Sequence, residues 1–151
     1  MGRIARILKH RSYDEADVRR VLGDAALKRL EARVHDSEKL HSGEIRLCIE
    51  AGLPTSYLWK RLSVRDRAIA MFGKLRVWDT EHNNGVLIYL LLAEHAIEIV
   101  ADRGLARHVP REHWEPIVAG MREAFRAHRF EPGLQAAIAA VDALLGQHFP
   151  L

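Results

Sequence analysis

The stretch of sequence that decides the fold is WDTEHNNGVLIYLLLAEHAIEIVADRGL, residues 78–105. Its centre, residues 86–92, is continuously apolar, which is typical of a central strand covered on both faces. Residues 97–101, in which only Glu98 is polar, predict a second, shorter strand. The two runs predict an antiparallel hairpin, so the segments that precede and follow it, 80–85 and 102–104, are expected at the same edge of the sheet.

A second strand and a crossover helix are predicted upstream of this stretch. Residues 44–50 alternate apolar and polar side chains, which is the period of a strand. Ser63 followed by Asp66 resembles a capping box that opens an amphipathic helix. A strand, a crossover helix and a second strand in this order predict parallel pairing of residues 44–50 with residues 86–92.

Further helices are predicted before and after the strands. Asp24 is expected to cap a helix that ends near residues 41–43. Pro110 fits the first turn of another helix, and Pro132 opens a final one. Helices can then cover both faces of the sheet. The predicted fold class is α/β, an α/β/α sandwich with a small mixed sheet made of a parallel β-α-β unit plus an antiparallel hairpin strand.

The composition is that of one ordinary globular domain. The chain has 151 residues, of which 48% are hydrophobic and 28% are charged. We expect a basic helical N-terminal arm, residues 1–22, and one α/β domain, residues 23–151. The longest apolar run, residues 86–93, is much shorter than the roughly 20 residues that span a bilayer. With a single cysteine, Cys48, and no signal sequence, a cytoplasmic location is expected.

The charge pattern argues against a nucleic-acid partner and is compatible with a protein partner or a membrane surface. The 23 basic and 20 acidic side chains are interleaved and give a net charge of +3, so no nucleic-acid partner is expected. A protein partner is plausible at the polar edge or at the arm. For the arm itself, docking on the domain is favoured over membrane-surface contact through residues 1–12.

Side chains with oxygen donors gather at the predicted polar edge. The candidate metal ligands are Asp79, Asn83, Asn84 and Asp102, and Glu38 and Glu81 offer further carboxylates. Such oxygen-rich sets suit calcium or magnesium. The same sequences are also typical of ordinary turns, because Asn and Asp cap turns locally and Gly accepts positive φ. Spacing alone favours the turn interpretation over the metal site.

The motifs of the familiar phosphatases and zinc sites are missing. A cysteine phosphatase would have Arg six positions after its cysteine, but Pro54 stands there, and Cys48 in mid-strand is interpreted as a buried, inert thiol. The nine histidines are scattered, although His41 and His82 can reach the polar edge. A zinc site is therefore not favoured.

The stretch 78–105, with His41-Ser42-Gly43-Glu44-Ile45 upstream and residues 125–149 downstream, resembles the TPM domain family, also called the TPM phosphatase family. Within it the chain is similar to the short, single-domain bacterial branch, over about residues 24–150. The resemblance implies an α/β/α sandwich and makes residues 23–151 a TPM-like domain. Plant thylakoid-lumen members are described as acid phosphatases and linked to photosystem II repair, and some bacterial members bind calcium.

The resemblance also implies which residues build the edge. It carries over to the turns through Gly43, Asn84, Gly85, Asp102 and Gly104, with Ser42 beside them. Long exported members have an early Asp-x-Ala-Gly motif, and Gly23-Asp24-Ala25-Ala26 is only a partial echo of it. That departure weakens the transfer of phosphatase activity.

Two functions follow as hypotheses, and no catalytic residue is assigned. The favoured one is a non-catalytic or weakly catalytic module that binds a divalent cation or a protein partner. The alternative is a cation-dependent, acid-phosphatase-like hydrolase, in which Asp102 and Asp79 hold the metal, a bound water attacks and Arg103 contacts phosphate.

Overall fold

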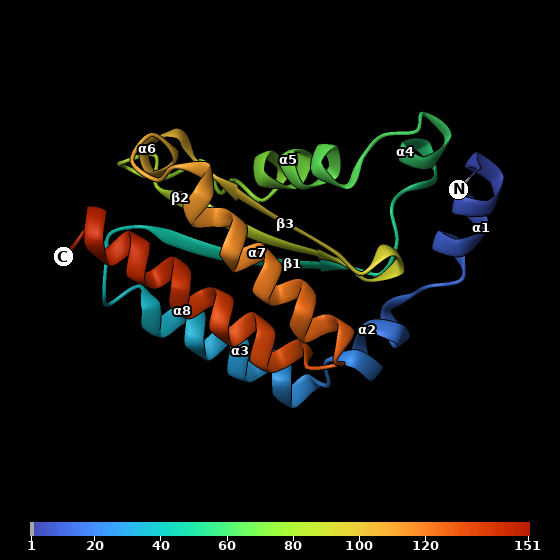
Figure 1. Ribbon diagram of the computed structural model, residues 1–151, viewed down its shortest axis with the longest axis horizontal. Helices are drawn as coiled ribbons and strands as arrows, with labels where there is room; N and C mark the ends of the chain where they lie inside the picture. Colours follow the sequence, from blue (N-terminus) through green and yellow to red (C-terminus); the bar gives the residue numbers. More distant parts are fainter. Residues whose placement is uncertain (1) are drawn as a thin grey trace.

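The computed structural model describes residues 2–151 and contains a three-stranded mixed sheet in the order β1-β2-β3 (Figure 1). The strands are β1 (Glu44–Glu50), β2 (Gly85–Leu91) and β3 (Ala96–Ala101). β1 runs parallel to β2, with Glu44 opposite Gly85, and β3 runs antiparallel to β2. The predicted topology and the predicted bounds of β1 are confirmed.

Helices cover both faces of this sheet, so the α/β/α sandwich is confirmed (Figure 1). One face carries α3 (Asp24–Ser37), α7 (Arg111–Arg126) and α8 (Phe130–His148). The other face carries α4 (Thr55–Trp59) and α5 (Val64–Lys74). The short elements are α1 (Arg3–Arg11), α2 (Glu15–Val21), η1 (Leu92–Glu94) and α6 (Arg103–Ala106). Among the described residues, no helix combines the length and apolar composition that a bilayer span requires.

The central strand β2 is apolar throughout because its alternate side chains enter two different cores. Val86, Ile88 and Leu90 pack among α3, α7 and α8, whereas Leu87, Tyr89 and Leu91 pack under α4 and α5. All seven residues of β2 are buried. Side chains alternate across a strand, so a strand between two helical layers needs apolar residues at every position.

The helix ends differ from prediction more than the strands do. The capping box of α5 is confirmed, with reciprocal hydrogen bonds between Ser63 and Asp66. Asp24, however, is the first residue of α3, and Gly23 is its N-cap. α3 ends at Ser37, before the expected residues 41–43. Between β1 and α5, α4 forms a short helical turn after Pro54.

A charged network anchors α5 to the sheet. The guanidinium of Arg67 donates two hydrogen bonds to Glu50 at the end of β1, of 2.7 and 2.9 Å. The hydroxyl of Tyr89 donates a third to the same carboxylate, at 2.7 Å. Burial disfavours the ionised carboxylate, but the bonds from Arg67 and Tyr89 outweigh it, and the pKa of Glu50 lies below its ordinary value.

The N-terminal helix α1 docks on the domain through polar contacts. His10 is buried, its Nδ1 accepts from the backbone N–H of Leu53 at 2.9 Å, and its Nε2 lies 2.7 Å from Glu94. Arg6 donates to Glu94 through Nε and Nη2 and to the carbonyl of Leu62 through Nη1. Burial lowers the pKa of His10 despite the neighbouring Glu94. The neutral imidazole is therefore the form that fits.

We expect the docking of α1 to weaken as the pH falls below about 6.5, the ordinary pKa of histidine. The folded protein binds fewer protons at His10 than the unfolded chain, so its contribution is present above that pH and is lost on acidification. Protonation would also remove the acceptor for Leu53 N–H. Hydrogen exchange of residues 3–11 at several pH values, corrected for intrinsic rates, checks this. Equal protection at pH 7.5 and 5 would contradict it.

Candidate cation site at the sheet edge

Three segments far apart in sequence meet at the edge where β1 and β2 begin and β3 ends. The register pairs Glu44 with Gly85 and Val86 with Ala101. Beyond the strands, Asp102 N–H donates to the carbonyl of Gly85 at 2.9 Å, and Gly104 N–H donates to Asn83 at 2.8 Å. We call the segments 41–43, 83–85 and 102–104 the polar edge.

Glycine is required at this edge by close packing. A Cβ on Gly85 would collide with the backbone oxygen of Val77, and one on Gly104 would collide with the carbonyls of His82 and Asn83. None of the described glycines has a positive φ, so the expected reason for glycine in these turns is wrong. The left-handed position is held by Asn83, with φ of 54°. Asn tolerates that region better than most residues.

Asn84 lies at the centre of the polar edge and is fully buried. Its backbone N–H donates to Thr80 Oγ1 at 3.1 Å, and its Nδ2 donates to Ser42 Oγ at 3.2 Å. Its Oδ1 is buried and has no hydrogen-bond partner among the described residues. Buried amide oxygens are rarely left without a partner, so this atom is a candidate ligand for a cation or a bound water.

Asp102 and Arg103 leave the sheet beside Asn84. One carboxylate oxygen of Asp102 accepts from Arg103 N–H at 2.7 Å and caps α6. Asp102 is partly buried and Arg103 is exposed. Within the described part of the chain, no acidic side chain pairs with the guanidinium of Arg103. A partly buried carboxylate and an exposed guanidinium without an acidic partner among the described residues are therefore neighbours in the chain.

Asp79 is not drawn into the polar edge by any contact. Its carboxylate pairs with Arg76 at 3.0 Å on the exposed turn before Thr80. Glu38 pairs with His35 at 3.7 Å, and Glu81 is exposed. The structure thus brings together Asn83, Asn84 and Asp102 with their supporting turns. In residues 2–151, no group of three or more His, Cys, Asp or Glu side chains could hold a metal.

A buried ion network supports the polar edge from behind. His41 Nε2 lies 2.9 Å from Asp142 Oδ1, and Arg33 Nη1 lies 2.7 Å from Asp142 Oδ2. His41 and Asp142 are 1% and 6% exposed, which is low enough that each needs its partner. The network joins α3, α8 and the residue before Ser42. It fixes the turn on which the hydroxyl partner of Asn84 stands.

Sequence reasoning considered His41 but missed Asp142 and Arg33. The available signal was the position of Asp142, four residues after Ile138 and next to Val141 in the apolar stripe of α8. A carboxylate on a core-facing stripe must be paired, because an isolated buried charge is very costly. Arg33, three residues after the fully buried Leu30, carried the same signal on α3.

The C-terminal residues close one side of the polar edge. Ser42 N–H donates to the carbonyl of Phe149 at 3.0 Å, and His41 forms a bridge with Pro150. The rings of His108 and His148 stack at 5.4 Å, and His82 stacks on Phe149 at 6.2 Å. These histidines are therefore grouped in space, although their sequence spacing suggested that they were scattered.

Cys48 lies away from this edge, in the middle of β1. Burial, with a smaller effect from the nearby Glu50 carboxylate, raises the pKa of its thiol to about 11. The thiol is half-buried and stays protonated near neutral pH. Its interpretation as an inert thiol is consistent with this environment.

Comparison with known proteins agrees with the geometry. A profile of the TPM domain matches residues 14–144. The NMR structure of the BA42 protein from the psychrophilic bacterium Bizionia argentinensis is similar at 29% identity and a TM-score of 0.75, covering 85% of this chain and 84% of that one. The N-terminal domain of a P. gingivalis protein shares the fold at 18% identity and a TM-score of 0.69, covering 85% and 79%. No curated protein sequence matches significantly.

Proposed function

The chain belongs to the TPM domain family, and from that premise we propose that it is a non-catalytic cation-binding and protein-interaction module. The cation is calcium or magnesium, and it binds at the polar edge. Asn84 Oδ1, a carboxylate oxygen of Asp102 and the amide of Asn83 supply protein ligands, and water completes the shell.

The observation that carries this proposal is the buried Asn84 amide. Its Nδ2 is held by Ser42, while its Oδ1 has no partner among the described residues. Leaving a buried acceptor unpaired costs about 1–3 kcal/mol. A hard cation would use that oxygen and would neutralise the neighbouring Asp102 carboxylate. Both effects favour the folded edge, so binding should stabilise the protein.

A band of exposed apolar side chains supports the interaction part of the proposal. Leu40 and Leu151 adjoin the His41–Pro150 bridge and are 55% and 77% exposed. Trp78, 48% exposed, precedes the turn that leads to Asn84. Exposed large apolar residues around a polar centre are typical of protein interaction surfaces. A bound cation would order the polar centre of that surface.

We expect Ca²⁺ or Mg²⁺ to raise the melting temperature, with saturation, and to bind with a calorimetric stoichiometry near one. Asp102→Asn should weaken binding by about tenfold or more, because it removes a charged ligand while Asn still caps α6. Asn84→Ala should abolish binding. Thermal shift and titration calorimetry at constant ionic strength check both variants.

Asp14→Asn is the matched control, because Asp14 is also an N-cap aspartate, at α2, but stands apart from the polar edge. It should bind the cation like the parent protein. Weakening of equal size in Asp14→Asn and Asp102→Asn would show a general charge effect and would contradict the assignment.

The alternative function, cation-dependent phosphate-ester hydrolysis, is favoured by Arg103. An exposed guanidinium without an acidic partner, next to a candidate metal ligand, suits a phosphate group. Turnover of p-nitrophenyl phosphate with added Ca²⁺ or Mg²⁺, lost in Asp102→Asn and weakened in Arg103→Gln, would favour the hydrolase. Cation binding without turnover would favour the interaction module.

A further inference from the structure

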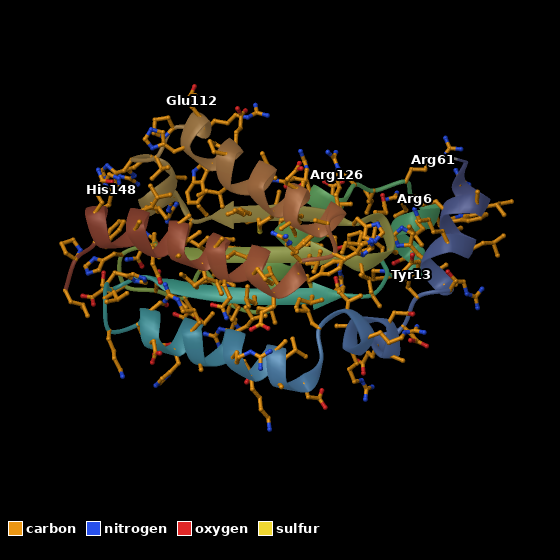
Figure 2. All side chains as sticks on the ribbon, turned by 60° about the horizontal axis from the view of Figure 1, so that its bottom comes forward. Arg6, Tyr13, Arg61, Glu112, Arg126 and His148 are labelled. Atoms are coloured by element: carbon orange, nitrogen blue, oxygen red, sulfur yellow. The ribbon has the colours of Figure 1, made fainter. Side chains whose placement is uncertain are left out.

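The end of the molecule opposite the polar edge presents an apolar and basic surface. It is formed by α1 and by α4 with the residues that follow it, which pack against each other (Figure 1). We define the N-terminal patch as Arg3, Ile4, Leu8, Trp59, Lys60 and Arg61. Figure 2 shows Arg6 and Arg61 at this end and His148 at the other.

The orientation of α1 is the first observation. Arg6 and His10, four residues apart, face the domain and bind Glu94. Ile4 and Leu8, also four residues apart, are 69% and 64% exposed. A helix that only stabilises the fold turns its apolar face to the core. α1 instead directs the polar side chains of Arg6 and His10 inward beside the partly buried Ile7, and it leaves two large apolar side chains outside.

The exposed apolar residues continue across α4. Trp59 is 58% exposed, and the guanidinium of Arg3 lies 4.6 Å from the centre of its ring. Arg6 also donates to the carbonyl of Leu62, which ties α1 to the segment after α4 at 2.9 Å. The two helices therefore present Ile4, Leu8 and Trp59 from one rigid end. Trp is enriched at the interface between water and hydrocarbon, because its ring is apolar and its N–H is polar.

The charge around these apolar side chains has one sign. Residues 2–13 and 51–65 contain no Asp or Glu. Arg11, Lys60 and Arg61 are exposed, and in the described part of the chain none of them takes part in an ion pair. The acidic Glu94 is occupied by Arg6 and His10. Exposed apolar side chains beside cations that have no acidic partner complement an anionic lipid surface.

We propose that the N-terminal patch binds the surface of an anionic phospholipid bilayer, with Trp59, Ile4 and Leu8 inserted at the headgroup boundary and the basic residues on lipid phosphates. The contact is peripheral, because α1 has only nine residues. It leaves the polar edge facing solution at the opposite end of the sheet.

Sedimentation with vesicles tests the proposal on the full chain. The protein should pellet with vesicles of phosphatidylcholine that contain about one third phosphatidylglycerol, and it should stay in solution with phosphatidylcholine alone. Lys60→Glu with Arg61→Glu should weaken partition by about thirtyfold or more. Ile4→Ser with Leu8→Ser, and separately Trp59→Ala, should weaken it by about tenfold.

Matched controls separate a specific patch from general attraction. Lys28→Glu with Lys39→Glu changes the net charge equally, from +3 to −1, because each replacement subtracts two. Trp78→Ala removes another exposed Trp that also lies beneath an arginine, Arg76, at 5.4 Å. Both controls should bind vesicles far better than the patch variants. Circular dichroism confirms that each variant is folded.

A second readout does not depend on removing the patch. With Trp78→Phe and Trp114→Phe, Trp59 is the sole tryptophan and is excited selectively at wavelengths where tyrosine absorbs little. Its emission should shift to shorter wavelength on adding anionic vesicles, and not on adding neutral ones. The proposal is overturned if the parent protein does not bind anionic vesicles, if patch and control variants lose binding equally, or if the emission of Trp59 does not move. A protein that binds this end without any lipid binding would also overturn it.

Discussion

Gly85→Ala is expected to lower the free energy of unfolding by about 3 kcal/mol, the upper part of the usual cost of overpacking. The new Cβ would meet the backbone oxygen of Val77, a residue that is itself fully buried. A flexible side chain could move aside, but a backbone carbonyl can move only with its turn. Gly85 also begins β2 and accepts from Asp102 N–H, so the shift would spread across the polar edge.

Urea denaturation followed by circular dichroism measures the effect. Gly120→Ala in α7 is the matched control, because nothing lies within 4 Å of a Cβ there. In an exposed helix interior that replacement should stabilise by roughly 0.5–1 kcal/mol. Similar stability changes in both variants would mean that the close approach of Gly85 to Val77 is wrong.

Arg67→Met is expected to cost about 3–5 kcal/mol, because it leaves the carboxylate of Glu50 buried without its cation. Glu50 and Arg67 side chains are 22% and 9% exposed, and Arg67 makes both of its bonds to one carboxylate. Arg29→Met is the control. Arg29 binds Glu131 in the same two-bond geometry at 2.7 Å, but the Arg29 side chain is 59% exposed, and its loss should change stability little.

The Arg67→Met variant should also differ from the parent protein in how its stability depends on pH. In the parent protein the pKa of Glu50 lies below its ordinary value, so its contribution is present above about pH 4.5 and is lost as the pH falls through the folded-state pKa. Without Arg67, burial remains the largest influence and should raise that pKa instead. The variant should therefore lose less stability than the parent protein between pH 7 and 5. A parallel loss in both would contradict the ion pair.

The strands could be predicted from the sequence because their signal is local. The alternation in residues 44–50 gave the bounds of β1, and the apolar run after Asn84 could only be a strand between two helical layers. Helix ends were less certain. Asp24 suits a cap, but Gly23 before it has the extended backbone that a cap needs. The helix therefore begins at Asp24, one residue earlier than predicted.

The candidate site was predicted in part, and the reason lies in the range of its contacts. The predicted strand order was enough to place Asn84 near Asp102, because the two residues flank the two strands of one hairpin. Asp142 lies 101 residues from His41, and no spacing rule connects residues that far apart. Close approaches such as that of Gly85 to Val77 are equally invisible in a sequence. The sequence shows that residue 85 is a glycine, but it does not show the contact that requires a glycine at that position.

Titration of the ¹⁵N-labelled protein with Ca²⁺ and with Mg²⁺, followed by amide chemical shifts, tests the central claim most directly. We predict saturable shifts of the amides of residues 41–43, 83–85 and 102–104 and of the Asn84 side-chain amide, with a single dissociation constant. In the same titration of Asp102→Asn, those amides should need about tenfold or more cation to reach the same shift. Shifts that stay absent from the polar edge, or that spread over exposed carboxylates such as Glu15 and Asp36, would contradict a cation site there.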